Sequence, residues 1–186
     1  GDTELVIEDI RTGKKTIVPR ATRAKLSEDG SKVVAVIKPL FEQTRQAKIK
    51  KAKKEDMPKD TLALIDVKSG KVEKYANYKS HATADKWSNY LAFELTPAKE
   101  KADKKAKKEE GKDDKKKPAP KKEVNKLLVM NVLTNKVDTI KNVTSYKFNE
   151  DGSWLAYVVE PEKKDSLGKA GLFLYNPANG ESKAVV

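Results

Sequence analysis

The feature that most constrains this chain is a phrase that occurs three times, a tight turn followed at once by an alternating apolar strand. The clearest copy is residues 149–158, NEDGSWLAYV, and the earlier copies are residues 27–36 and 85–93. The copies are spaced by roughly 60 residues, and self-similarity at a nearly fixed period is the signature of propellers and other repeat arrays. The sequence therefore predicts a repeat architecture.

A second phrase is interleaved with the first, an apolar strand, a turn that runs from Asp or Asn through three residues to Gly or Asn, and a more polar strand. Glycine or asparagine holds the last turn position in every copy, which indicates a positive φ that a residue with a Cβ adopts only at a cost. Each copy is therefore predicted to be a hairpin. The four copies are residues 5–14, 62–71, 127–136 and 172–181, and the turn residues are Gly13, Gly70, Asn135 and Gly180.

Together the two phrases supply four short antiparallel strands per unit, which is the composition of a propeller blade. We therefore expect residues 1–186 to form an all-β fold, a β-propeller fragment of about three and a half four-stranded antiparallel blades with lysine-rich insertions. The pattern also separates a strand at 72–75 from one at 81–84, and predicts a helix of about ten residues within 42–57. The expected units are an outer half blade (3–20), a blade with an insertion at 40–60 (21–78), a blade with a disordered insertion at 98–125 (79–142) and a last blade (143–186).

The net charge of +12 raises the question of a nucleic-acid partner. Residues 42–60 carry seven Lys or Arg against four acids, and residues 98–126 carry thirteen Lys against seven acids, so nine of the twelve charges lie in two insertions. These tracts mix acids with bases and lack interleaved aromatic residues for base stacking. We interpret them as solvated loops with no specific nucleic-acid partner, and keep polyanion binding as a third hypothesis.

Few residues have the chemistry of a catalytic or metal site. The chain has no cysteine, a single histidine at His81 and no Gly-x-Ser-x-Gly pentapeptide. His81 is interpreted as an ordinary strand residue, and we predict no catalytic, cofactor-binding or metal-ligating residues and no cofactor. No apolar run approaches the ~20 residues of a membrane span, so none is expected.

Two further groups of residues have both a structural and a functional interpretation. The acidic pairs Glu28-Asp29 and Glu150-Asp151 resemble a carboxylate dyad, but they stand before glycine, where Asp accepts backbone N–H bonds in turns. The aromatic residues could stack on a ligand, although packing between blades is the simpler role. They are Trp87, Tyr90, Phe93, Trp154, Tyr157, Phe173 and Tyr175.

Residues 148–157, FNEDGSWLAY, resemble the F-S-x-D-G-x-x-L-A-Y phrase of the propeller domains in the prolyl oligopeptidase family of serine peptidases, which TolB-like propellers share. Together with residues 39–48, PLFEQTRQAK, and 57–62, MPKDTL, the sequence looks like the large exported members of that family from Bacteroidetes-type bacteria. The dipeptidyl members carry a paired-glutamate motif that residues 85–90 do not match.

The resemblance implies a noncatalytic propeller that gates and docks peptide substrates for a C-terminal α/β-hydrolase domain outside this chain. No catalytic residue is carried over to this chain, and the resemblance implies that the parent protein is a serine peptidase. The resemblance also implies a periplasmic or exported location. A stand-alone or TolB-like propeller that binds a protein partner is the alternative. We further expect the fragment to self-associate, because an incomplete ring leaves blade faces and strand edges uncovered.

Overall fold

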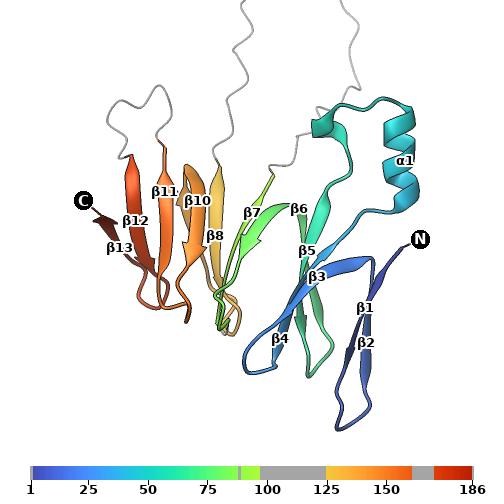
Figure 1. The fold of residues 1–186 in the computed structure, drawn as a ribbon, viewed down its shortest axis with the longest axis horizontal. Helices are drawn as coiled ribbons and strands as arrows, with labels where there is room; N and C mark the ends of the chain where they lie inside the picture. Colours follow the sequence, from blue (N-terminus) through green and yellow to red (C-terminus); the bar gives the residue numbers. More distant parts are fainter. Residues whose placement is uncertain (1, 88, 97–124, 161–169, 186) are drawn as a thin grey trace, which may run out of the picture.

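The computed structural model describes residues 2–87, 89–96, 125–160 and 170–185, which are built almost entirely of antiparallel strands (Figure 1). The insertion predicted at 98–125 and a polar loop at 162–170 lie almost wholly outside these residues. The tight hairpin turns lie together along the lower edge of the molecule in this view. The strands are β1 Glu4–Glu8, β2 Lys15–Pro19, β3 Ala21–Leu26, β4 Lys32–Ile37, β5 Asp60–Asp66, β6 Val72–Ala82, β7 Tyr90–Leu95, β8 Lys126–Asn131, β9 Val137–Lys141, β10 Val143–Phe148, β11 Leu155–Val159, β12 Gly171–Asn176 and β13 Glu181–Val185.

The strands pair as up-and-down meanders. A hairpin of β1 and β2 comes first, β3 to β9 follow in one seven-stranded sheet, and β10 to β13 form a four-stranded sheet. We call β3 to β6 the first blade, β6 to β9 the second blade and β10 to β13 the third blade. The chain is an all-β propeller fragment.

The seven-stranded sheet contains two blades because they share β6. The prediction of separate strands at 72–75 and 81–84 was wrong, since Val72–Ala82 is one continuous strand. Asn77 has a φ of 60°, and the register shifts between Tyr78 and Ser80. This bulge redirects the strand from the outer edge of the first blade to the inner edge of the second without ending it.

Each blade begins its inner strand in the same way. A residue with left-handed φ stands just before or within the strand, and its carbonyl accepts an N–H from the end of the neighbouring strand. A register shift follows within β3, β6 and β10. The repeat is therefore visible in backbone geometry as well as in sequence. The pairs are Lys38 N to Arg20 O (2.9 Å), Thr96 N to Asn77 O (2.7 Å) and Glu160 N to Asn142 O (3.1 Å).

The turns of the first repeated phrase also join consecutive blades. The Glu28 N–H donates to the Trp87 carbonyl over 2.7 Å, and the Lys86 N–H donates to the Glu150 carbonyl over 2.8 Å. Gly152 lies so close to the second blade that an added Cβ would stand 3.2 Å from the Ala84 Cβ. Its φ of 79° and this close approach both favour glycine there.

The core lies mainly between blades. One buried cluster joins the first and second blades and includes Trp87 and Phe93. Another joins the second and third blades and includes Tyr157 and Tyr175. Tyr90 and Phe173 pack against the second cluster, so the predicted packing role is confirmed for six of the seven aromatic residues. Trp154 is only half-buried, with the Lys183 ammonium 5.9 Å from its ring.

The predicted helix is present as α1, Phe41–Ile49, and a 3₁₀ turn follows at Lys54–Asp56. The helix buries no residue and lies at the opposite end of the sheet from the hairpin turns (Figure 1). Within the described part of the chain, no helix is long and apolar enough to cross a membrane.

Candidate functional site

The inner strands β3, β6 and β10 bring polar side chains from all three blades toward one another. Lys25 on β3 donates to the Ala84 carbonyl over 2.6 Å, and Ser80 on β6 lies 2.8 Å from the Tyr146 hydroxyl on β10. We call this surface the inner-strand cluster. It consists of Arg23, Lys25, Tyr78, Lys79, Ser80, His81, Glu94 and Tyr146.

His81 is paired with a tyrosine rather than with a carboxylate. The Tyr78 Oη lies 2.8 Å from His81 Nδ1, and the two ring centroids are 5.6 Å apart. Burial lowers the pKa of His81, and the positive charges of Arg23 and Lys25 lower it further. Burial raises the pKa of Tyr78. Near pH 7 a neutral imidazole can therefore accept a hydrogen bond from a neutral phenol.

Glu94 places a carboxylate in the interior of the second blade. Its side chain is 4% exposed, and Lys79 Nζ lies 2.6 Å from its Oε2. The Ser80 hydroxyl also reaches Glu94 Oε2 at 3.5 Å and links it to Tyr146 of the third blade. Burial raises the pKa of Tyr146. The ion pair with Lys79 and the Ser80 hydroxyl satisfy a charge that would otherwise be costly to bury.

This arrangement is better suited to hydrogen bonding with a bound ligand than to nucleophilic catalysis. Ser80 and His81 are neighbours in sequence, but the Ser80 hydroxyl contacts Tyr146 and Glu94 while the His81 ring contacts Tyr78. A nucleophile needs a base within hydrogen-bond reach. Among the described residues, no three His, Cys, Asp or Glu side chains gather in a way that could hold a metal ion.

The acidic pairs lie in turns, as predicted. Asp29 accepts bonds from the Ser31 N–H (3.1 Å) and the Ser27 hydroxyl (2.6 Å). Asp151 accepts bonds from the N–H (2.9 Å) and hydroxyl (2.7 Å) of Ser153. These bonds lower the pKa of both carboxyls, the Ser27 hydroxyl having the largest effect on Asp29 and the Ser153 N–H on Asp151. The carboxylates therefore stabilise turns and form no dyad.

Sequence reasoning missed Glu94 and Tyr146. A signal for Glu94 was present, since an acid interrupts the apolar strand YLAFEL. Strand pairing places Glu94 where the first blade has Val36 and the third has Val158, so an alignment of the three repeats would have found it. Tyr146 carries no comparable signal, because its role depends on a contact between blades.

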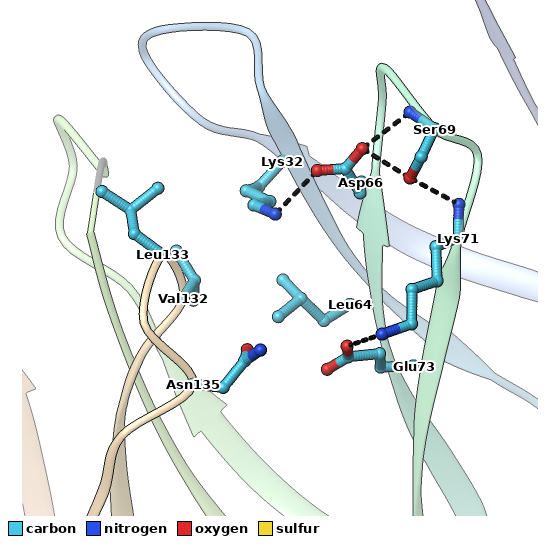
Figure 2. A pocket seen from close by; sticks show the side chains of 9 residues that line it. All are labelled: Lys32, Leu64, Asp66, Ser69, Lys71, Glu73, Val132, Leu133 and Asn135. Atoms are coloured by element: carbon cyan, nitrogen blue, oxygen red, sulfur yellow. Dashed lines mark hydrogen bonds and ion pairs between the residues drawn. The ribbon is translucent and has the colours of Figure 1, made fainter.

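A groove of about 300 Å³ lies outside the inner-strand cluster, between the β5–β6 turn of the first blade and the β8–β9 turn of the second (Figure 2). Four charged side chains line the first-blade side around Leu64, and Val132, Leu133 and Asn135 line the second-blade side. No residue of this groove was predicted as part of a site.

No family model matches the chain, and no curated protein matches it either. Solved structures do match at low identity. The β-propeller domain of the Trilobed protease from Pyrococcus furiosus, described as having an open velcro topology, is 13% identical with a TM-score of 0.48, over 87% of this chain and 41% of that chain. The uncomplexed acylaminoacyl peptidase from Pyrococcus horikoshii is 14% identical with a TM-score of 0.49, over 100% of this chain and 28% of that chain.

The tricorn protease is also similar, at 12% identity and a TM-score of 0.44, over 93% of this chain and 15% of that chain. The chain thus spans less than half the length of these solved structures. The repeated strand pairing within the chain itself, rather than these likenesses, identifies it as a propeller fragment.

Proposed function

We propose that this chain is part of a noncatalytic propeller that gates and docks peptide substrates for a serine peptidase of the prolyl oligopeptidase family. The observation that carries the proposal is the convergence of hydrogen-bonding side chains on the inner strands of three blades. It is supported by the resemblance of residues 148–157 to the turn phrase of that family. The hydrolase domain would lie outside these 186 residues, in a protein of the large exported type.

The inner-strand cluster gives this role a chemical basis. A peptide carries one donor and one acceptor per residue, and these groups need partners when the peptide leaves water. The Arg23 guanidinium is exposed, and its charge lowers the pKa of His81 and opposes the rise that burial causes in the pKa of Tyr78. A guanidinium donates several hydrogen bonds in a fixed fork and suits carbonyl and carboxylate oxygens. Peptides passing the inner strands would contact this group.

A serine-reactive fluorophosphonate probe tests the proposal. In a longer protein that contains this chain, we expect the probe to label one serine outside residues 1–186 and to leave this chain unlabelled. The isolated chain should turn over no prolyl or dipeptidyl chromogenic peptide. An unlabelled full-length protein would contradict the peptidase assignment and favour the alternative, a propeller that binds a protein partner.

A second measurement tests docking separately. In the full-length protein, Arg23→Glu should raise KM for peptide substrates several-fold and leave the rate of fluorophosphonate labelling unchanged, because only the peptide reaches the inner strands. Lys74→Glu is the matched control, since Lys74 is exposed on the outer half of β6. Equal kinetics for the Arg23 variant and the control would refute a docking role for the cluster.

A further inference from the structure

The groove between the β5–β6 and β8–β9 turns differs from the inner-strand cluster in that it contains two complete ion pairs. Lys32 Nζ lies 2.8 Å from Asp66 Oδ2, and Lys71 Nζ lies 2.8 Å from Glu73 Oε1 (Figure 2). The Lys32 and Asp66 side chains are 17% and 31% exposed. All four charged groups line the groove, and their charges sum to zero.

The two ion pairs lie on the same side of the groove and act on each other. The hydrogen bond from Lys71 lowers the pKa of Glu73, and the charge of Lys32 lowers it further. The hydrogen bond to Glu73 raises the pKa of Lys71, and the charge of Asp66 adds to that effect. The four groups therefore form one electrostatic unit.

Apolar side chains line the groove on both sides. Leu64 and Val132 are buried members of the core cluster, and Leu133 at the tip of the β8–β9 turn is 57% exposed. Figure 2 shows Leu64 between the two ion pairs, with Leu133 and Asn135 on the facing turn. The groove thus combines two ion pairs with apolar side chains and one amide.

At the other two junctions, different side chains occupy the positions that correspond to this groove. Between the second and third blades, Tyr90 stands at the position of Lys32 and Asn131 at that of Asp66. Asp138, at the position of Glu73, accepts a 2.7 Å hydrogen bond from the Tyr175 hydroxyl.

Between the β1–β2 hairpin and the first blade, the lysine that ends the β1–β2 turn reaches the β5–β6 turn. The Lys14 ammonium donates to the Lys68 carbonyl over 3.0 Å and to the Ser69 carbonyl over 3.4 Å. Lys136 and Asp138 repeat the Lys71–Glu73 pair at 3.8 Å. Within the described residues, however, the Lys32–Asp66 pair has no counterpart between the second and third blades, where Tyr90 and Asn131 take its place. The repeat does not require this arrangement, so a separate role can account for it.

We propose that this groove binds a small zwitterion with an apolar body, of the class of a free α-amino acid with an aliphatic side chain. An anion alone would compete with Asp66 and Glu73 for the lysines, and a cation alone would compete with the lysines for the acids. The ammonium of a zwitterion can pair with an acid of the groove while its carboxylate pairs with a lysine. Its side chain can cover Leu64 and Leu133. About 300 Å³ is at the small end of ligand sites. The proposal is independent of the peptidase role.

Titration of the 186-residue chain with L-leucine, followed by amide chemical shifts, tests the proposal. We expect saturable shifts at the groove residues with a Kd on the order of 1 mM, because the charges are partly solvated. N-acetylleucine lacks the ammonium group and leucinamide lacks the carboxylate, so each should bind at least tenfold more weakly. Equal binding of either blocked form would refute the zwitterion assignment, as would the absence of saturable groove shifts up to 20 mM leucine, which is about 20 times that Kd.

A pair of matched variants locates the binding. Lys71→Gln removes a 69% exposed lysine of the groove, which should leave the fold intact and weaken leucine binding at least fivefold. Lys136→Gln changes the equivalent lysine of the second blade, which does not line the groove and should leave binding unchanged. Similar affinities for the two variants would overturn the proposal. Circular dichroism of both confirms that folding is unaffected.

Discussion

Removal of Lys79 should destabilise the fold more than removal of its partner Glu94. Lys79→Met leaves the Glu94 carboxylate buried without its counter-ion, and breaking a fully buried pair in this way costs about 3–5 kcal/mol. The Lys79 side chain is 47% exposed, so water can replace part of its effect. We therefore expect a loss of about 1–2 kcal/mol, or roughly a tenfold rise in the unfolding equilibrium constant.

Glu94→Val should cost less, within about 1 kcal/mol of the unchanged chain, because replacing a buried ion pair by apolar groups is often neutral. Valine is the residue at the equivalent positions of the first and third blades. In this variant the Lys79 ammonium remains in water, and the hydroxyls of Ser80 and Tyr146 remain bonded to each other at 2.8 Å. The double variant should match Glu94→Val alone, since without the carboxylate the lysine has no partner to lose.

Urea denaturation followed by tryptophan fluorescence measures all three variants against the unchanged chain. The expected order of destabilisation is Lys79→Met above Glu94→Val, with the double variant equal to the latter. The reasoning would be refuted by a Lys79→Met variant of unchanged stability together with a Glu94→Val variant that loses more than about 3 kcal/mol. That result would mean that the carboxylate is held by other partners, such as the hydroxyls, and that the lysine is irrelevant.

Three further predictions concern the core, the histidine and the second insertion. Trp87→Ala should cost about 3–5 kcal/mol in denaturant unfolding because the ring is 1% exposed, whereas Trp154→Ala should cost clearly less, and equal losses would contradict this. The folded pKa of His81 lies below its ordinary 6.5, so the unfolded chain binds the proton more tightly and stability should fall as pH drops below about 6.5. His81→Gln should flatten this slope between pH 7.5 and 5.5, and an unchanged slope would assign it to other groups. Deletion of residues 99–122, which lie outside the described residues, should shift the melting temperature by no more than a few degrees.

Most of the fold could be predicted because the same turn and strand patterns occur several times in the sequence. The glycine turns set hairpin positions through a backbone requirement, and Gly13, Gly70 and Gly180 all have the expected positive φ. Asn135, with a φ of 60°, fills the same position in the fourth copy. The continuous course of β6 could not be predicted, because residues 76–80 lack the apolar alternation that marks a strand and their pairing depends on two different blades.

The candidate sites were less predictable than the fold because they depend on contacts between blades. Tyr146 and Ser80 are 66 residues apart in sequence, and no local pattern indicates that their hydroxyls meet. Leu133 has the appearance of an ordinary turn residue until the β8–β9 turn is seen facing the Lys32–Asp66 pair across the groove. Local propensity fixes turns and strands, whereas a site formed by two repeats requires their relative placement.

The differences among the repeats therefore carry more functional information than their similarities. At one position near the end of the second strand the three blades have Val36, Glu94 and Val158, and the acid adds a buried carboxylate that binds Lys79 and Ser80. At the first position of the same strand the first two blades have Lys32 and Tyr90, and the lysine forms part of a charged groove whereas the tyrosine packs against the core. Packing alone would be satisfied by the apolar residue in each case, since a buried ion pair is weak evidence for stability. At the positions where the repeats differ, we therefore expect substitutions to change ligand binding more than they change the stability of the fold.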